Sequence, residues 1–100
     1  MSTQVMTDAE RALGHLERLT DDLRSRGWLV EVAAPGDRWP TALVSNRELP
    51  GLNESVIAAP DHSGADWCYY FGWGERIAPC SEADRAVATL ARVLAVRTDT

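Results

Sequence analysis

The chain has 100 residues, about the length of one domain, and its composition of 45% hydrophobic and 25% charged residues is that of an ordinary globular protein. This composition excludes general disorder, and no stretch approaches the ~20 consecutive apolar residues that a membrane helix needs. Fifteen acidic against ten basic residues give a net charge of −5, and positions 28–80 hold seven acids against three arginines. Because this acidic segment would repel a phosphate backbone, we expect no direct nucleic-acid partner.

The first ten residues contain neither the basic region nor the apolar region of a signal peptide. We therefore expect a cytoplasmic protein with no membrane partner. We also expect residues 1–100 to form a single domain, with 1–6 and 97–100 as flexible ends.

An amphipathic helix is predicted over residues 8–26. Thr7 and Glu10 have the spacing of a capping box, in which each side chain accepts a hydrogen bond from the backbone of the other residue. Gly27 is suited to end the helix in the left-handed conformation. Apolar residues recur every three or four positions and form one stripe, namely Ala9, Ala12, Leu13, Leu16, Leu19 and Leu23.

Four short β-like runs follow, at residues 28–33, 41–45, 54–59 and 66–73. Proline, glycine, asparagine and aspartate punctuate the segments between them. Each connection is shorter than the dozen residues that a parallel crossover requires, so the sequence predicts an antiparallel meander.

A second helix is predicted after Pro79, with Ser81 as its N-cap and Asp84 completing the spacing of a capping box. Its core stripe is expected to contain Ala83, Val87, Leu90 and Leu94, widened by Ala86, Ala91 and Val93. The element order α-β-β-β-β-α predicts a two-layer α+β domain with two helices on one face of the sheet.

Five of the seven aromatic residues fall within positions 67–73. In a strand, Trp67, Tyr69, Phe71 and Trp73 would share one face, because side chains alternate. A face covered by helices does not easily absorb so much aromatic surface, and exposed apolar patches mark partner sites. We therefore expect these four residues to include the partner-binding surface, with Trp73 as the most exposed ring.

Candidate chemistry is sparse. Cys80 precedes a helix, where a thiolate is favoured, but no companion histidine is evident in the sequence. His15 is expected on the solvent side of its helix, and His62 lies in a polar turn of residues 61–63, so no zinc site is expected. The sequence thus predicts no catalytic residues, no metal and no cofactor.

The whole chain resembles small acidic α+β proteins of bacteria with high-GC genomes that accompany helix-turn-helix regulators. The segments that carry this resemblance are 26–28, 43–46, 52–56, 67–74 and 77–79. The resemblance implies a regulatory accessory that acts through protein contact. The layout is also similar to acidic secretion chaperones, which pair helices with a curved sheet and dimerise.

The leading hypothesis from the sequence is a non-enzymatic interaction module that binds a protein partner, or itself as a homodimer, through its aromatic sheet face. One alternative is a small-molecule-binding domain with a pocket between sheet and helices. Another is an enzyme that uses Cys80 or an acid such as Glu75.

Overall fold

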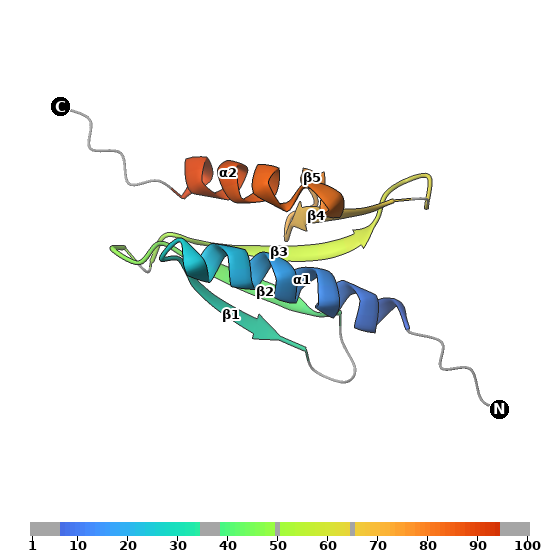
Figure 1. The fold of residues 1–100 in the computed structure, drawn as a ribbon, viewed down its shortest axis with the longest axis horizontal. Coiled ribbons are helices and arrows are strands. Elements are labelled where there is room, and N and C mark those ends of the chain that lie inside the picture. Colours follow the sequence, from blue (N-terminus) through green and yellow to red (C-terminus); the bar gives the residue numbers. More distant parts are fainter. Residues whose placement is uncertain (1–6, 35–38, 50, 65, 95–100) are drawn as a thin grey trace.

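The structure is a computed structural model that describes residues 7–34, 39–49, 51–64 and 66–94 (Figure 1). The expected flexible ends, 1–6 and 97–100, lie outside the described residues. No helix in the described ranges is long and apolar enough to cross a membrane. In chain order the elements are α1 (Asp8–Ser25), β1 (Leu29–Ala33), β2 (Thr41–Ser45), β3 (Asn53–Pro60), β4 (Trp67–Phe71), β5 (Arg76–Pro79), a 3-10 turn (Cys80–Glu82) and α2 (Ala83–Val93).

Helix α1 begins and ends at the signals that the sequence carries. The Glu10 backbone amide donates to the Thr7 hydroxyl at 3.1 Å, and the Thr7 amide donates to the Glu10 carboxylate at 3.3 Å, so the capping box is confirmed. At the other end Gly27 has φ +92°, and the amide of Trp28 donates back to the Leu23 carbonyl at 3.1 Å. This is a Schellman-type ending, and it directs the chain from the helix straight into β1.

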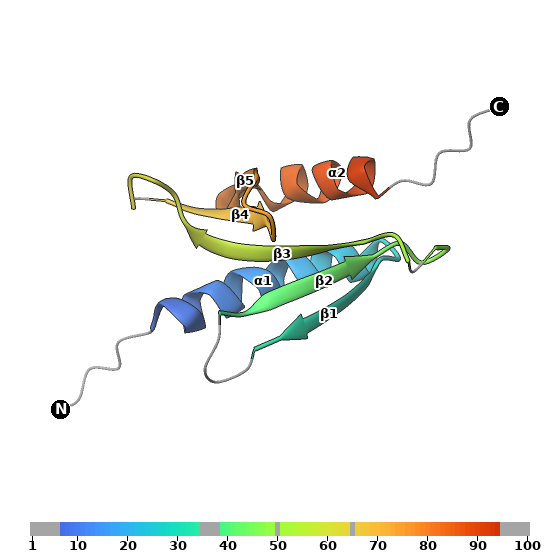
Figure 2. The same cartoon turned by 180° about the vertical axis from the view of Figure 1, so that it is seen from behind.

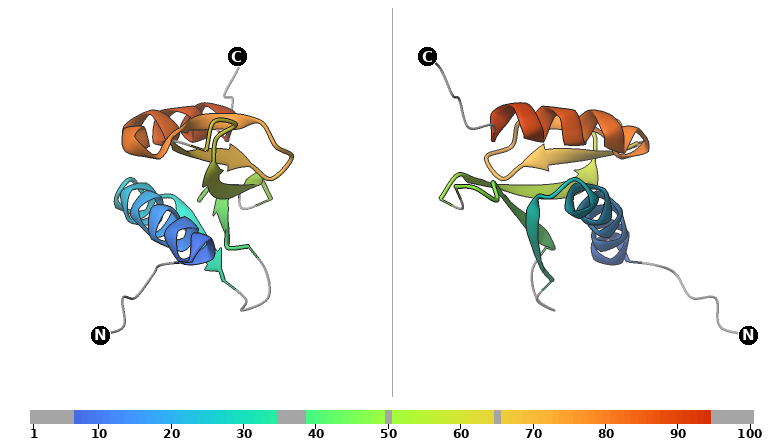
Figure 3. Two further views of the ribbon diagram at one scale, coloured as in Figure 1. Left: turned by 90° about the vertical axis from the view of Figure 1, so that its right-hand side faces the viewer. Right: turned by 60° about the vertical axis from the view of Figure 1, so that its left-hand side comes forward.

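The sheet is an antiparallel meander in the order β1-β2-β3-β4-β5, which confirms the predicted α+β class. Both helices lie on one face, α1 over β1, β2 and β3 and α2 against β5 (Figure 3). Seen from behind, β1 and β2 stand in front of α1 and no helix covers them (Figure 2). Within the described part of the chain, helices therefore cover one sheet face and leave the other, the uncovered face, without a helix.

Two expectations about the elements are wrong. The sheet has five strands, because residues 76–79 pair with β4 although they are few and end in proline. A terminal proline fits there, since β5 is an edge strand and one side of it needs no ladder hydrogen bonds. Ser81 is not the N-cap of α2: it lies inside the 3-10 turn, and the helix begins at Ala83 without a side-chain cap.

The core fills the space between the helices and the covered sheet face. Most of the predicted stripe residues are buried, but Ala9, Leu13, Ala83 and Ala91 are only partly buried and Val93 is 44% exposed. Thr20 is also buried on α1, and its hydroxyl finds no hydrogen-bond partner among the described residues. The largest fully buried side chains are Tyr69, Phe71, Leu16, Leu19, Leu23, Leu90 and Leu94.

Candidate functional site

The row of aromatic residues in and just after β4, namely Trp67, Tyr69, Phe71 and Trp73, belongs mainly to the core. Tyr69 and Phe71 are 0% and 1% exposed beneath the helices, and the Tyr69 hydroxyl donates to the His15 carbonyl of α1 at 2.7 Å. The expectation that these two residues form a partner surface is therefore wrong. The physical reason is that these rings face the helices and fill the core together with side chains such as Leu16 of α1 and Ala86 of α2.

The two ends of the row reach the surface. Trp67 is half-buried and lies between the His15 ring, at a centroid distance of 5.2 Å, and the Trp39 ring, at 6.3 Å. Trp73 is 60% exposed, as expected, and stacks on Phe71 with centroids 4.4 Å apart. It sits in the β4–β5 turn, where Gly74 has φ +105°, so it is not part of the uncovered sheet face.

The uncovered face carries apolar side chains of its own. Leu43 on β2 is registered opposite Glu31 on β1 and Ser55 on β3, so Leu29 and Ile57 are its diagonal neighbours. Diagonal neighbours of this kind are about 7–8 Å apart and within reach of long side chains.

This diagonal continues across a fourth strand, because Ile57 is registered opposite Tyr70. We name Leu29, Leu43, Ile57 and Tyr70 the apolar diagonal. Leu29 and Leu43 are 46% and 36% exposed, and the other two are partly exposed. Burial of Tyr70 and the nearby Cys68 raise the pKa of the Tyr70 hydroxyl. It is therefore a neutral donor at physiological pH.

The structure brings Cys80 into a hollow of about 300 Å³ that His15, Arg18, Asp66 and Trp67 also line. The sequence did not reveal this proximity, and His15 is half-buried there rather than on the solvent side of α1. Its Nδ1 contacts the Arg18 guanidinium. His15 and Cys80 are 65 positions apart, and they meet because the 3-10 turn that carries Cys80 packs on β4, where the Trp67 ring contacts the His15 ring.

The electrostatics of this hollow do not favour a nucleophilic thiol. Burial, and secondarily Cys68, raise the pKa of Cys80 to about 12, so the thiol keeps its proton at neutral pH. Burial and the Arg18 charge lower the pKa of His15, so the imidazole stays neutral. A reactive cysteine needs the opposite arrangement, a thiolate stabilised beside a cation.

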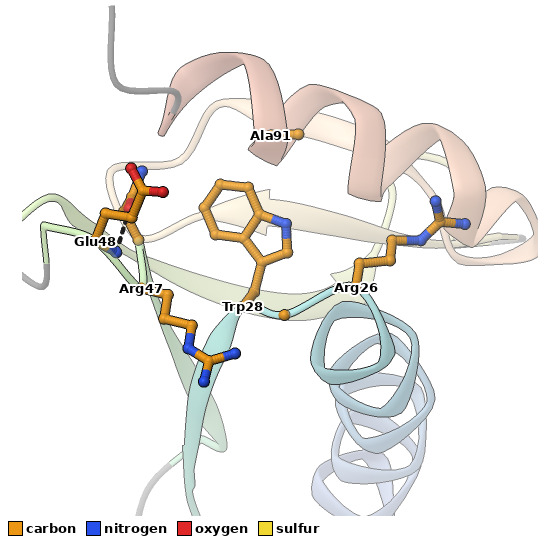
Figure 4. A pocket seen from close by; sticks show the side chains of 7 residues that line it. Arg26, Trp28, Arg47, Glu48 and Ala91 are labelled. Carbon is orange, nitrogen blue, oxygen red and sulfur yellow. Dashed lines mark hydrogen bonds between the residues drawn. The ribbon is translucent and has the colours of Figure 1, made fainter.

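A second cleft, of about 440 Å³, opens at the far end of the molecule (Figure 4). It lies between the end of α1, the β2–β3 loop and α2, and the indole of Trp28 stands inside it. The ligand-binding alternative requires a pocket between helices and sheet, whereas this cleft lies between the ends of the helices and a loop. The other residues that line it are Arg26, Gly27, Asn46, Arg47, Glu48 and Ala91.

Asn46 also lines this cleft, and the sequence alone did not indicate its structural role. Its side chain is buried; Nδ2 donates to the Leu94 carbonyl at 2.7 Å, and Oδ1 accepts from the amides of Glu48 and Leu49 at 2.8 and 3.2 Å. Asparagine after a strand is a common turn signal, but its contact with the end of α2 depends on residues 48 positions away.

Among the described residues, no group of three His, Cys, Asp or Glu side chains could hold a metal ion. Comparisons with known proteins give no match to a family model, to a curated protein or to a solved structure.

Proposed function

We propose that this protein is a non-enzymatic interaction module that docks another protein on its uncovered sheet face. The observation that carries the proposal is the apolar diagonal, which runs over four strands of a face that no helix covers. Contiguous exposed apolar surface is characteristic of protein–protein contact sites. This proposal keeps the interaction module that the sequence suggested, but it assigns the docking surface to the sheet face opposite the one that carries Tyr69 and Phe71.

The residues around the apolar diagonal favour a flat docking surface. Ser45, Ser55 and Gly72 lie at neighbouring positions of the register, and a Cβ built on Gly72 would come within 3.0 Å of the Ser55 Cβ. Because these neighbours are small, the four larger side chains project from the surface of the sheet. Burial of a leucine or isoleucine costs only about 0.5–1 kcal/mol of side-chain entropy, and tyrosine is a frequent hot-spot residue.

Charge determines the kind of partner. The chain carries −5 overall, and the segment that contains the whole sheet holds seven acids against three arginines. A protein with an apolar surface rimmed by cationic side chains is complementary in both respects, and its association would be accelerated at low salt. A second copy of the same acidic chain lacks this complementarity.

The test is site-specific photocross-linking from the uncovered face in the native cell. A benzophenone amino acid at position 43 should trap one protein that has an excess of lysine and arginine. The same group at position 49 is the matched control, because Leu49 is 48% exposed but lies in the β2–β3 loop, outside the apolar diagonal.

The trapped protein is then purified and titrated against the wild type, Leu43→Asp and Leu49→Asp. Loss of binding in Leu43→Asp alone supports the proposal. Equal cross-linking from both positions, or equal affinity of both variants, contradicts it. Sedimentation of the purified chain provides a further check. If the wild type forms a stable homodimer that Leu43→Asp dissociates, the occupant of the uncovered face is a second copy of the chain and not a cationic partner.

A further inference from the structure

We infer that the cleft around Trp28 is a binding site for a small planar carboxylate. This inference is independent of the docking surface, because the cleft lies between the helix ends and the β2–β3 loop and includes no residue of the apolar diagonal. Its volume of about 440 Å³ is within the range of small-molecule sites.

The indole of Trp28 provides the apolar surface of the site. It is half-buried, and one side packs against the hydrophobic core. Figure 4 shows the ring beneath Ala91 of α2, with Arg26 and Arg47 on opposite sides. Ala91 presents only a methyl group where α2 borders the cleft, and planar groups stack favourably on the part of an indole that is left exposed.

Guanidinium groups provide the anion-binding part. The Arg47 side chain forms no ion pair with any described residue, whereas Arg26 is held near the cleft by Asp22 at 3.5 Å and Asp84 at 3.9 Å. Arginine matches a carboxylate through two parallel hydrogen bonds. The indole Nε1 also has no partner in the described chain, and its edge is turned toward Arg26 (Figure 4).

The site is formed before any ligand arrives. The Schellman-type ending of α1 fixes Gly27 and Trp28, and the three hydrogen bonds of Asn46 fix the loop that bears Arg47. A preorganised site avoids the cost of ordering loops on binding. Arg26 is already paired with Asp22 and Asp84, so Arg47 is the cation beside Trp28 that a ligand anion would meet.

The experiment titrates the full chain, labelled with ¹⁵N, with 2-naphthoate and follows the indole Nε1–H signals. The Trp28 signal, assigned by its loss in Trp28→Phe, should shift with a dissociation constant on the order of 1 mM, as the usual ligand efficiency gives for a probe of this size. Uncharged 2-naphthamide should bind at least about tenfold more weakly.

Two variants separate a specific site from general attraction to arginine. Arg47→Gln should weaken naphthoate binding by about tenfold or more, and Arg76→Gln, at an exposed position on β5, should leave it unchanged. Both replace surface side chains, so the fold is retained. No shift of the Trp28 signal at about 10 mM probe, equal affinity for the amide, or equal affinity of Arg47→Gln and the wild type would each overturn the inference.

Discussion

Replacing Asn46 by alanine should destabilise the protein far more than its place in a loop suggests. The side chain is 8% exposed and forms three hydrogen bonds, to the Leu94 carbonyl and from the Glu48 and Leu49 amides. A net contribution of about 0.5–1.5 kcal/mol for each gives a loss of ~2–4 kcal/mol. That is a large fraction of the ~5–15 kcal/mol stability of a typical domain.

The assay is urea unfolding followed by circular dichroism, with Asn46→Asp as the informative companion. Aspartate keeps the acceptor for the two amides but turns a carboxylate oxygen toward the Leu94 carbonyl, so it should cost at least as much as alanine at pH 7. Protonation restores a donor and a buried, unfavourably placed carboxyl has a raised pKa, so the deficit of Asn46→Asp relative to Asn46→Ala should shrink as the pH falls from 7 toward ~4 and change no further below that. A loss under about 0.5 kcal/mol in Asn46→Ala would refute the structural role assigned to this residue.

Four further predictions concern stability. Leu16→Ala and Leu90→Ala, both at fully buried positions, should each cost ~2–5 kcal/mol, and unchanged denaturant midpoints would show that the helix faces are misassigned. Trp73→Ala should cost at most ~1.5 kcal/mol, because only one face of this 60% exposed ring is stacked on Phe71; global unfolding of the variant would show that the ring is essential to the core. Gly27→Ala should cost ~1–2 kcal/mol purely through its φ of +92°, since no atom lies within 4 Å of the added Cβ; a stability equal to wild type would contradict the left-handed helix end. The pKa of Cys80 is raised from 9.0 to about 12, so the stability that its protonated thiol contributes is present below pH 9.0 and lost as the pH rises through 12. Between these pH values the unfolding free energy of Cys80→Ala should therefore fall less steeply than that of the wild type. Identical slopes for the two proteins would mean that the thiol is not buried.

Local signals predicted the helices and the meander well. The capping box at Thr7, the glycine after α1 and the spacing of the apolar residues all act over a few positions, so sequence alone specifies them. Strand β5 was missed because Arg76–Pro79 has too few residues for a periodic pattern. Its pairing depends on the turn at residues 72–75, which folds it back on β4.

The candidate sites were harder to predict because they are set by which sheet face the helices cover. Alternation placed Tyr69 and Phe71 on one face correctly, but it cannot say whether that face meets helices or solvent. The apolar diagonal depends on the register of four strands, and the Trp28 cleft on contacts between α1, α2 and the β2–β3 loop. These long-range relations appear only in the folded chain.

The affinity of the cross-linked partner for Leu43→Asp, compared with Leu49→Asp, tests the central claim most directly. Loss of one leucine contact and burial of a charge should weaken binding by at least about tenfold in Leu43→Asp. Leu49→Asp should stay within about twofold of the wild type, since both leucines are exposed to a similar extent and only Leu43 lies on the uncovered face. Equal affinities for the two variants would contradict the assignment of that face as the docking surface.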